Sequence, residues 1–408
     1  MKILIFAPYI YDRTHSEFSK TRSGFGYMVK DILTEVAKYD EVLLITHQFT
    51  KGYKNGYTVL KHTKMDMLIN LNLKNICKGI KCFFVSKAPM ANKIRYAYYY
   101  FNAGSVKKCV DTVKPDLIHI HGLTLQTKPI IEMCNAFGYP YIVTLHGLIG
   151  LDESTNAPQA DKMYEYEALR EFDKCNQTIT VISSGILNRI INHYKLSGRN
   201  IRVILNGTYL PQNIIKVNMP KKIFLCIGTV SKRKNQMQLL RVCLLLRNEF
   251  RCSMEIHIVG ALGDQINIAE QISELGLEDV IKYDGFIQRE EMDKLWQRAD
   301  YNIVMSKDEG FGLSIIEGYA YGVPTITFSD LDAVRDLYNG NSMILIDNRT
   351  DAAVAEALTL AVEKQWDSKK IIEISKRYSM EMMGKAYRDL YHYEIKEKSK
   401  RNGQMYKD

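Results

Sequence analysis

Residues 306–324 read "SKDEGFGLSIIEGYAYGVP", a short segment that joins two apolar runs. It places Glu309 and Glu317 eight residues apart, with Gly310 and Gly312 close behind the first glutamate. Glycine costs about 1 kcal/mol relative to alanine inside a helix, but it permits loop conformations that bring backbone amides close to a ligand. We therefore expect a strand, then a loop that contains Glu309, then a helix that carries Glu317 about one turn from its start.

The apolar residues that follow the glycines repeat at the spacing of a helix. They are Ile315, Ile316, Tyr319, Ala320 and Val323. The expected helix begins near Gly312 and Leu313, and Pro324 prevents its continuation. Free amides and the helix dipole at such an N-terminus favour anions such as phosphate. Glu317 is better placed to accept hydrogen bonds from a ribose, and Glu309 to bind the hydroxyls of a second sugar.

Short apolar runs alternate with helical patterns along the whole chain, which is typical of parallel sheets covered by helices. The runs of the first half are 3–8, 41–47, 116–122, 141–147, 178–183 and 202–207, and those of the second half are 222–228, 255–260, 280–285, 301–306, 324–329 and 342–347. At 408 residues the chain exceeds the size of a single core. We therefore predict an α/β protein of two Rossmann-like, doubly wound domains, with the site in the interdomain cleft.

The domain boundaries follow from a stretch with prolines and little apolar periodicity, "NGTYLPQNIIKVNMPKK". We place a first domain at 1–205, a linker at 206–220, a second domain at 221–376 and a C-terminal helix at 377–408. Helical spacing puts Met383, Tyr387 and Tyr391 on the buried face of that last helix. We expect the helix to cross back onto the first domain.

The composition is that of an ordinary globular protein, with 46% hydrophobic and 25% charged residues. No apolar run has the length of a membrane span, and the first residues lack the cleavage pattern of a secretory signal. The eight cysteines form no CxxC pair. We interpret them as reduced thiols and expect a cytoplasmic protein.

The net charge of +9 is concentrated in one segment, residues 51–108, which holds twelve Lys and Arg residues and a single acid, Asp66. Aromatic residues are interleaved with these cations at Phe83, Phe84, Tyr96, Tyr98, Tyr99, Tyr100 and Phe101. We predict that the segment faces an anionic membrane and holds the protein peripherally on its inner face. The alternative is a solvated basic face over buried tyrosines. No nucleic-acid module accompanies the charge, so we expect no nucleic-acid partner.

The glutamates and glycines of 306–324 resemble the E-x7-E motif of the retaining glycosyltransferases of group 1 (family 4), which have the two-domain GT-B fold. The surrounding stretch "VIKYDGFIQREEMDKLWQRADYNIVMSKDEGFGLSIIEGYAYGVPTI" is similar to the family's donor domain. In the first domain "KPDLIHIHG", "YIVTLHG", "TVISSG" and "VILNG" also resemble family signatures. The resemblance covers almost the whole chain and is weakest at about 50–105.

The resemblance implies transfer of a sugar, of the hexosyltransferase type, from a nucleotide diphosphate sugar to a hydroxyl of a glycan or lipid-linked acceptor in polysaccharide biosynthesis. It assigns acceptor binding to the first domain and donor binding to the second. The catalytic residues that it implies are Glu309, His146 and Lys234. The implied donor-binding residues are Gly24, Gly26, Arg233, Lys234, Phe286, Ile287, Glu309, Gly310, Phe311, Gly312, Leu313 and Glu317. No protein-bound metal or cofactor is expected.

The diphosphate contacts show one departure from the family pattern. In "IGTVSKRKNQ" Lys234 matches the family lysine, but Thr229 stands where the family has an arginine. Arg233 has two interpretations, either as the replacement for that arginine or as part of a solvent-exposed run with Lys232.

The remaining assignments rest on short motifs. Gly24 and Gly26 resemble a glycine loop over the donor phosphates, for which a plain turn is the alternative. Phe286 follows a strand at the family's nucleobase contact, where backbone atoms of Ile287 read the base. His146 matches a histidine that touches the transferred sugar. We expect His119 and His121 to pack or line the cleft rather than to bind metal.

Two other functions share parts of this pattern. A sugar-nucleotide epimerase of GT-B-like fold would have the same donor site but its own acid and base residues. A non-catalytic subunit of a polysaccharide-assembly complex would account for Thr229. An NAD-dependent enzyme fits less well, because neither half has G-x-G-x-x-G directly after its first strand.

Overall fold

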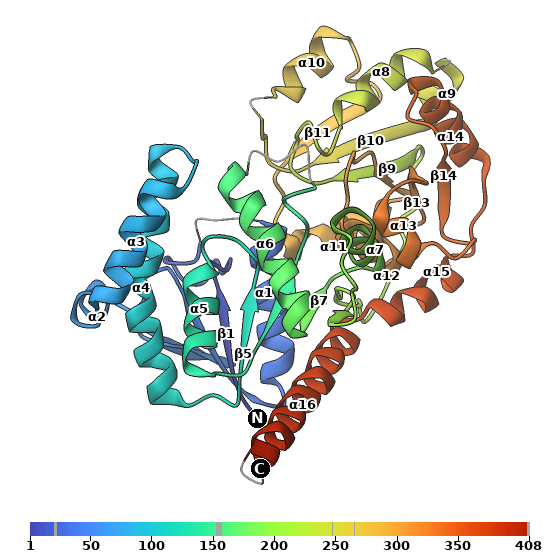
Figure 1. Ribbon diagram of the computed structural model, residues 1–408. Coiled ribbons are helices and arrows are strands. Elements are labelled where there is room, and N and C mark those ends of the chain that lie inside the picture. Colours follow the sequence, from blue (N-terminus) through green and yellow to red (C-terminus); the bar gives the residue numbers. More distant parts are fainter. Residues whose placement is uncertain (20–22, 152–156, 247, 265, 406–408) are drawn as a thin grey trace. The chain divides into compact units, whose positions relative to one another are not determined.

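The computed structural model describes residues 1–405 apart from 20–22, 152–156, 247 and 265 (Figure 1). The chain divides into two compact units. The first comprises Met1–Ile182, Ile186–Leu205 and Met380–Asp408, and the second comprises Ser183–Gly185 and Asn206–Ser379. The change of unit after Leu205 lies where the linker was predicted to begin, and the return to the first unit lies just beyond the predicted position.

The first unit contains an eight-stranded sheet in the order β3-β4-β2-β1-β5-β6-β7-β8. The strands are β1 (Lys2–Ala7), β2 (Glu41–Thr46), β3 (Tyr53–Asn55), β4 (Tyr57–Val59), β5 (Leu117–His121), β6 (Tyr141–Leu145), β7 (Ile179–Val181) and β8 (Ile201–Val203). All neighbours pair in parallel except β3 and β4, which form a short antiparallel hairpin. The central strands β5 and β6 are buried along their whole length, as expected for a sheet covered on both faces.

The helices of the first unit connect these strands (Figure 1). They are α1 (Gly24–Ala37), α2 (Lys64–Ile69), α3 (Leu73–Val85), α4 (Met90–Val113), α5 (Lys128–Phe137), α6 (Gln159–Cys175), α7 (Ser184–Tyr194), which starts in the second unit, and α16 (Met380–Met405). Helices α3 and α4 form a tight pair, because the backbone of Gly79 lies against Phe101 and no Cβ atom would fit there.

The second unit contains a six-stranded sheet, parallel throughout, in the order β11-β10-β9-β12-β13-β14. The strands are β9 (Lys222–Ile227), β10 (Met254–Val259), β11 (Ile281–Gly285), β12 (Tyr301–Val304), β13 (Thr325–Phe328) and β14 (Met343–Ile346). The α-helices are α8 (Met237–Leu245), α9 (Asn248–Ser253), α10 (Ile268–Glu274), α11 (Met292–Arg298), α12 (Leu313–Ala320), α13 (Asp332–Leu337), α14 (Asp351–Glu363) and α15 (Ser368–Ser375), and two 3₁₀ turns lie at Arg289–Glu291 and Lys376–Tyr378.

All twelve strands predicted from the apolar runs are present. The hairpin of β3 and β4 was not predicted. Each of its strands has three residues, too few to show a period, and the turn is centred on Gly56 with a positive φ of 75°.

The last helix, α16, packs against α1 within the first unit. Met383, Tyr387 and Tyr391 lie on its buried face, as the helical spacing predicts. The hydroxyl of Tyr391 lies 2.7 Å from Nδ1 of the buried His119 on β5, and Arg388 pairs with Asp40 at 2.9 Å. The C-terminal helix is thus part of the core of the first unit.

We expect Tyr387→Ala to lower the free energy of unfolding by about 3 kcal/mol or more, because it empties a fully buried aromatic site. Tyr393→Ala on the same helix is the matched control. Its side chain is 52% exposed, so its effect should stay within about 0.5 kcal/mol. Urea unfolding followed by circular dichroism measures both, and equal effects would contradict the role of α16 in the core.

Candidate functional site

Two loops of the second unit meet where its sheet changes direction. From β9 the chain builds β10 and β11 on one side, and then returns to build β12, β13 and β14 on the other. Strands β9 and β12 are therefore neighbours, and their carboxyl ends lie side by side. Such a switch point is where open α/β sheets bind ligands. The loops that follow the two strands, 228–236 and 305–312, form the candidate site.

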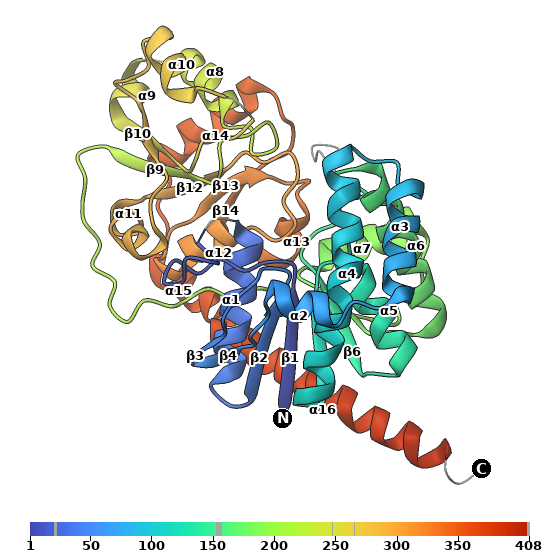
Figure 2. The same ribbon diagram turned by 90° about the vertical axis from the view of Figure 1, so that its left-hand side faces the viewer.

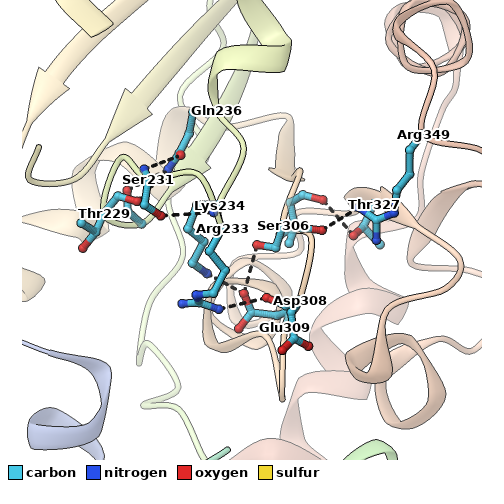
Figure 3. Close-up of polar contacts among 12 residues, drawn as sticks. Thr229, Ser231, Arg233, Lys234, Gln236, Ser306, Asp308, Glu309, Thr327 and Arg349 are labelled. Carbon is cyan, nitrogen blue, oxygen red and sulfur yellow. Dashed lines mark hydrogen bonds and ion pairs between the residues drawn. The ribbon is translucent and has the colours of Figure 1, made fainter. Parts of the chain in front are cut away.

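The first loop is closed by the buried side chain of Gln236 (Figure 3). Its amide Nε2 donates to the carbonyl oxygens of Gly228 and Thr229, at 3.1 and 3.2 Å, and its Oε1 accepts the backbone N–H of Ser231 at 3.2 Å. Gly228 has a φ of 140°, and a Cβ atom there would lie 3.1 Å from Cε of Lys234. The glycine thus leaves room for the Lys234 side chain to pass over the end of β9.

The second loop is held from two sides (Figure 3). Arg349 donates from Nη1 to the carbonyl oxygen of Ser306 at 3.0 Å. Arg233 donates from Nη1 to the carbonyl oxygen of Asp308 at 2.9 Å, and its own carbonyl accepts the N–H of Lys307 at 2.8 Å. These bonds fix the loop backbone at the three residues that precede Glu309.

Lys234 and Glu309 form an ion pair that joins the two loops, with 2.5 Å between Nζ and Oε2. The side chains are only 19% and 13% exposed, and Ser306 Oγ adds a hydrogen bond to the same carboxylate oxygen at 3.2 Å. Burial raises the pKa of Glu309, but the charges of Lys234 and Arg233 and the hydrogen bonds outweigh it, so the pKa lies below its ordinary value. The site therefore holds an ionised carboxylate beside a cation.

The helix after this loop begins as predicted. Gly312 is the N-cap of α12 and has a φ of 83°, and a Cβ atom there would lie 2.7 Å from Ile315. No side chain caps the helix, and the N–H of Ile315 bonds the carbonyl of Gly312 at 2.9 Å, so the amides of Leu313 and Ser314 are the ones that can meet a ligand. Glu309 lies in the loop and Glu317 in the second turn of the helix, which confirms the strand, loop and helix expected from the sequence.

The neighbours of Glu309 in the motif have different environments. Phe311 is buried and packs edge-on against Tyr378, whereas Gly310 and Leu313 are half-buried. Phe311 and the buried Gly312 therefore anchor the end of the loop, whereas Gly310 and Leu313 remain near the surface.

Arg233 and Lys232 have different environments. Lys232 is exposed, as a solvated charge would be. Arg233 is half-buried, bonded to the loop of Glu309, and close enough to lower the pKa of that carboxyl. The interpretation as a solvent-exposed run therefore applies to Lys232 and is wrong for Arg233.

Phe286 and Ile287 follow β11 at the same edge of the sheet, after Gly285 with a φ of 70°. Strand β10 separates them from the Lys234 loop. Phe286 is 36% exposed, so it is a surface residue rather than a core residue, while Ile287 is half-buried against the core beside Trp296.

In the first unit His146 follows β6 and lies beside His121 of β5, with 2.9 Å between Nε2 of His146 and Nδ1 of His121. Phe25 packs edge-on against the His146 ring at 4.9 Å. Burial lowers the pKa of His146 to about 4 and that of His119 to about 3, so both rings are neutral at pH 7. His119 and His121 are fully buried, as the packing interpretation requires.

Gly24 and Gly26 occupy the first turn of α1, after the N-cap Ser23, and so do not form a free loop. A Cβ atom on Gly26 would lie 2.9 Å from the backbone nitrogen of Tyr11. The glycine is therefore required by close packing in the first unit. Thr21 and Arg22, which precede this turn in the motif, lie outside the described residues.

Residues that sequence reasoning missed form the frame of the site. Gln236, Ser306 and Arg349 hold the two loops, yet none carries a motif of its own. Gln236 has a weak signal, because a polar residue is unusual at the buried start of a helix. Arg349 is distant in sequence, and only the pairing of strands brings it close.

Two negative findings concern the part of the chain that the structure describes. No group of three or more His, Cys, Asp or Glu side chains there is arranged to hold a metal ion. No described helix combines the length and the apolar character needed to cross a bilayer.

Two family models match the chain. The model for glycosyl transferases group 1 matches residues 212–378, and the model for Glycosyltransferase Family 4 matches residues 36–210. Together they match most of the first unit and nearly all of the second.

Among curated relatives, the chain is 23% identical over 260 residues to a D-inositol 3-phosphate glycosyltransferase of Arthrobacter sp. (strain FB24), a match that covers 60% of this chain and 61% of the relative. It is 24% identical over 307 residues to a GDP-mannose:cellobiosyl-diphosphopolyprenol alpha-mannosyltransferase of Xanthomonas oryzae pv. oryzae (strain PXO99A), covering 68% and 74%. The chain thus spans less than two thirds of the first relative. A solved structure, sucrose-phosphate synthase from Thermosynechococcus elongatus, superposes with a TM-score of 0.75 at 15% identity, covering 96% of this chain and 99% of that one, which shows a shared fold.

The ion pair of Glu309 makes a prediction for pH dependence. A carboxyl whose pKa is depressed by folding stabilises the protein above its ordinary pKa of 4.5, and this contribution is lost as the pH falls through the lower folded value. The difference in unfolding free energy between the unchanged protein and Glu309→Gln should therefore be largest near pH 7 and shrink below about pH 4.5. Urea unfolding across this range measures it. Glu356→Gln, at an exposed position on α14, should show no such change.

Proposed function

Because the chain belongs to the group 1 glycosyl transferases, we propose that it transfers a sugar from a nucleotide diphosphate sugar to a hydroxyl of a glycan or lipid-linked acceptor, with retention at the anomeric carbon. The fold is the GT-B fold that the sequence predicted. The observation that carries the proposal is the Lys234–Glu309 pair beside the uncapped N-terminus of α12. This arrangement offers a cation and free amides for a diphosphate, and a carboxylate for sugar hydroxyls.

In the proposed mechanism the bond between the anomeric carbon and the diphosphate oxygen breaks, and the acceptor oxygen attacks from the same face of the sugar. The acceptor proton passes to an oxygen of the leaving diphosphate. Lys234 and the first amides of α12 stabilise the negative charge that develops on that group. The lysine ammonium has three donors, so it can contact phosphate while it still bonds Glu309.

The carboxylates have separate roles in this proposal. Glu309, ionised in its loop, accepts hydrogen bonds from the transferred sugar and orients it. Glu317, one turn inside α12, accepts them from the ribose. His146 is neutral and contacts outer hydroxyls of the sugar. The Xanthomonas relative is named for a diphosphopolyprenol acceptor, which supports an acceptor that is carried on a lipid.

We also propose that the enzyme acts in the cytoplasm at an anionic membrane through residues 51–108. The aromatic part of the membrane prediction is wrong for Tyr96 and Tyr100, which are buried, as the alternative of a basic face over buried tyrosines expects. The exposed apolar residues lie instead along one face of α3 at helical spacing, where Leu73, Ile80 and Phe84 are 76%, 48% and 74% exposed.

Lysines flank this apolar face, with Lys74 and Lys81 exposed on the same helix. An outward apolar stripe bordered by cations is typical of helices that lie in the membrane interface. Each lysine near an anionic surface contributes about 1 kcal/mol. The observed side-chain exposure therefore supports membrane association through α3 in place of the tyrosines.

We expect Glu317→Ala to weaken binding of the free nucleotide diphosphate, because the ribose loses its acceptor, whereas Glu309→Gln should lower turnover at nearly unchanged nucleotide affinity. Calorimetry with nucleoside diphosphates measures the first effect. A thermal-shift panel of nucleotide sugars selects the donor beforehand, since a ligand at 100 times its Kd adds about 2.7 kcal/mol of stability. Glu356→Ala on α14 is the control. Equal nucleotide affinity in the wild-type protein and Glu317→Ala would refute the assignment of Glu317 to the ribose. A protein that bound no nucleotide sugar would refute the transferase proposal.

Membrane association is tested by co-sedimentation with vesicles. We expect binding to anionic but not to neutral vesicles, released by salt. Ile80→Asp with Phe84→Asp should weaken it by about tenfold or more, because two apolar side chains leave the interface. The matched control is Leu244→Asp with Leu245→Asp, two exposed residues of α8 in the second unit. Membrane association through α3 would be refuted if both double variants lost binding equally, or if the protein did not bind anionic vesicles.

A further inference from the structure

A cavity of about 660 Å³ in the first unit is lined by residues of helices α3, α4, α5 and α6. Figure 2 shows where these four helices lie. The volume of the cavity is typical of small-molecule sites. Asp161, at the start of α6, connects the segments around the cavity. Its carboxylate accepts a hydrogen bond from the hydroxyl of Tyr96 on α4 at 2.5 Å and another from the N–H of Leu125 at 2.9 Å. Leu125 belongs to the loop after β5. The cavity is therefore built by segments that buried hydrogen bonds hold together.

The lysines that line this cavity are of two kinds. Lys78 and Lys128 are both ion-paired with Glu132 of α5, Lys128 at 3.5 Å, and Glu132 also accepts the hydroxyl of Tyr100 at 2.9 Å. Lys81, on α3, and Lys87, in the turn before α4, have no carboxylate within ion-pair distance among the described residues. Glu167 of α6 is the other acid of the lining. Lys81 and Lys87 are exposed, so two lysines without an ion pair in the described part of the chain stand against a single remaining acid, Glu167, in the lining.

The rest of the lining is mainly apolar. Leu125 is buried at depth, while Val85 and Met163 lie at the rim with 69% and 49% exposure. Val85 continues into the exposed apolar residues Phe84 and Met90 of the α3–α4 pair. Val85 and Met163 therefore offer exposed apolar contacts to a hydrocarbon chain at this cavity.

The remaining rings do not provide a platform for a sugar or a base. Tyr100 is buried and bonded to Glu132, and the face of Tyr164 is covered by the ammonium of Lys128 at 4.6 Å. A ligand that matches aliphatic walls and two unpaired lysines is an amphiphile with a phosphate or diphosphate at one end.

We propose that this cavity binds a lipid phosphate, with the phosphate or diphosphate on Lys81 and Lys87 and the hydrocarbon chain along Val85 and Met163. The inference rests on the proposed transferase function and deepens it, because it names the acceptor class as a sugar carried on a lipid diphosphate. It differs from membrane association, since it concerns one molecule in a cavity rather than the bilayer surface.

Calorimetry on the full chain tests the proposal with farnesyl diphosphate below its critical micelle concentration, in the absence of vesicles. We expect farnesyl diphosphate to bind at least tenfold more tightly than inorganic diphosphate or farnesol. Inorganic diphosphate has only the anionic group, and farnesol has only the hydrocarbon chain. Lys81→Glu with Lys87→Glu should weaken binding at least tenfold. The matched control is Lys61→Glu with Lys64→Glu, which makes the same charge change at exposed positions of the same basic segment outside the cavity and should stay within twofold.

A second pair of variants tests the apolar wall. Met163→Asp should weaken farnesyl diphosphate but leave inorganic diphosphate unchanged, whereas Met65→Asp, at an exposed position on α2, should change neither. These positions are exposed, and thermal unfolding checks that each variant remains folded.

Three results would overturn the cavity assignment. They are an absence of binding, equal loss in the control pair, and equal affinity for inorganic diphosphate, which would indicate a free phosphate site. A protein that binds nucleoside diphosphate but not farnesyl diphosphate would refute this inference and leave the transferase proposal intact. A protein that binds farnesyl diphosphate but no nucleotide would refute the transferase proposal and leave the lipid-phosphate cavity intact.

Discussion

The ion pair of Lys234 and Glu309 imposes the strictest requirement on the second unit. Two charges with less than a fifth of their surface exposed are stable only when each meets the other in good geometry, and loss of one partner from such a pair costs about 3–5 kcal/mol. The pairing of β9 with β12 supplies the proximity, but proximity alone leaves two loops free to move apart. Gln236 closes one loop, and Arg233 and Arg349 hold the other. The frame of hydrogen bonds therefore exists to keep one charge opposite another.

In the first unit, neutral side chains rather than an ion pair are held in place at the ends of the central strands. Its sheet also changes direction, between β1 and β5, and histidines rather than ions gather near the ends of its central strands. His119 has both ring nitrogens engaged, Nδ1 with Tyr391 and Nε2 with Thr144, and burial keeps it neutral. Because Tyr391 comes from α16, this C-terminal helix helps to fix the His119 ring, which lies 4.0 Å from the His121 ring. His121 in turn contacts His146. Remote packing thus sets the orientation of a candidate sugar contact.

The sequence allowed prediction of those features that depend on local chemistry. The twelve strands had apolar runs long enough to recognise, and the loop of Glu309 had two glycines that a helix would not favour. The hairpin of β3 and β4 was too short to show a period. Tyr96 and Tyr100 were expected on a surface because they lie among lysines, whereas in the structure they are buried on the inner side of α4. Composition located the charge, but only the packing of α3 on α4 determined which residues face outward.

Thr229 stands where the family has an arginine, and a nearby arginine in the structure can supply the missing charge. Thr229 is exposed at the end of β9, and its methyl group lies so close to Gly263 that a Cβ atom there would come within 2.9 Å of it. Arg233 enters from the other side of the same loop, donates one N–H to Asp308, and lowers the pKa of Glu309. A guanidinium has five N–H donors, so most remain after this bond. We infer that the positive charge missing at position 229 is supplied from position 233, which would keep two cations, Arg233 and Lys234, beside the proposed diphosphate site.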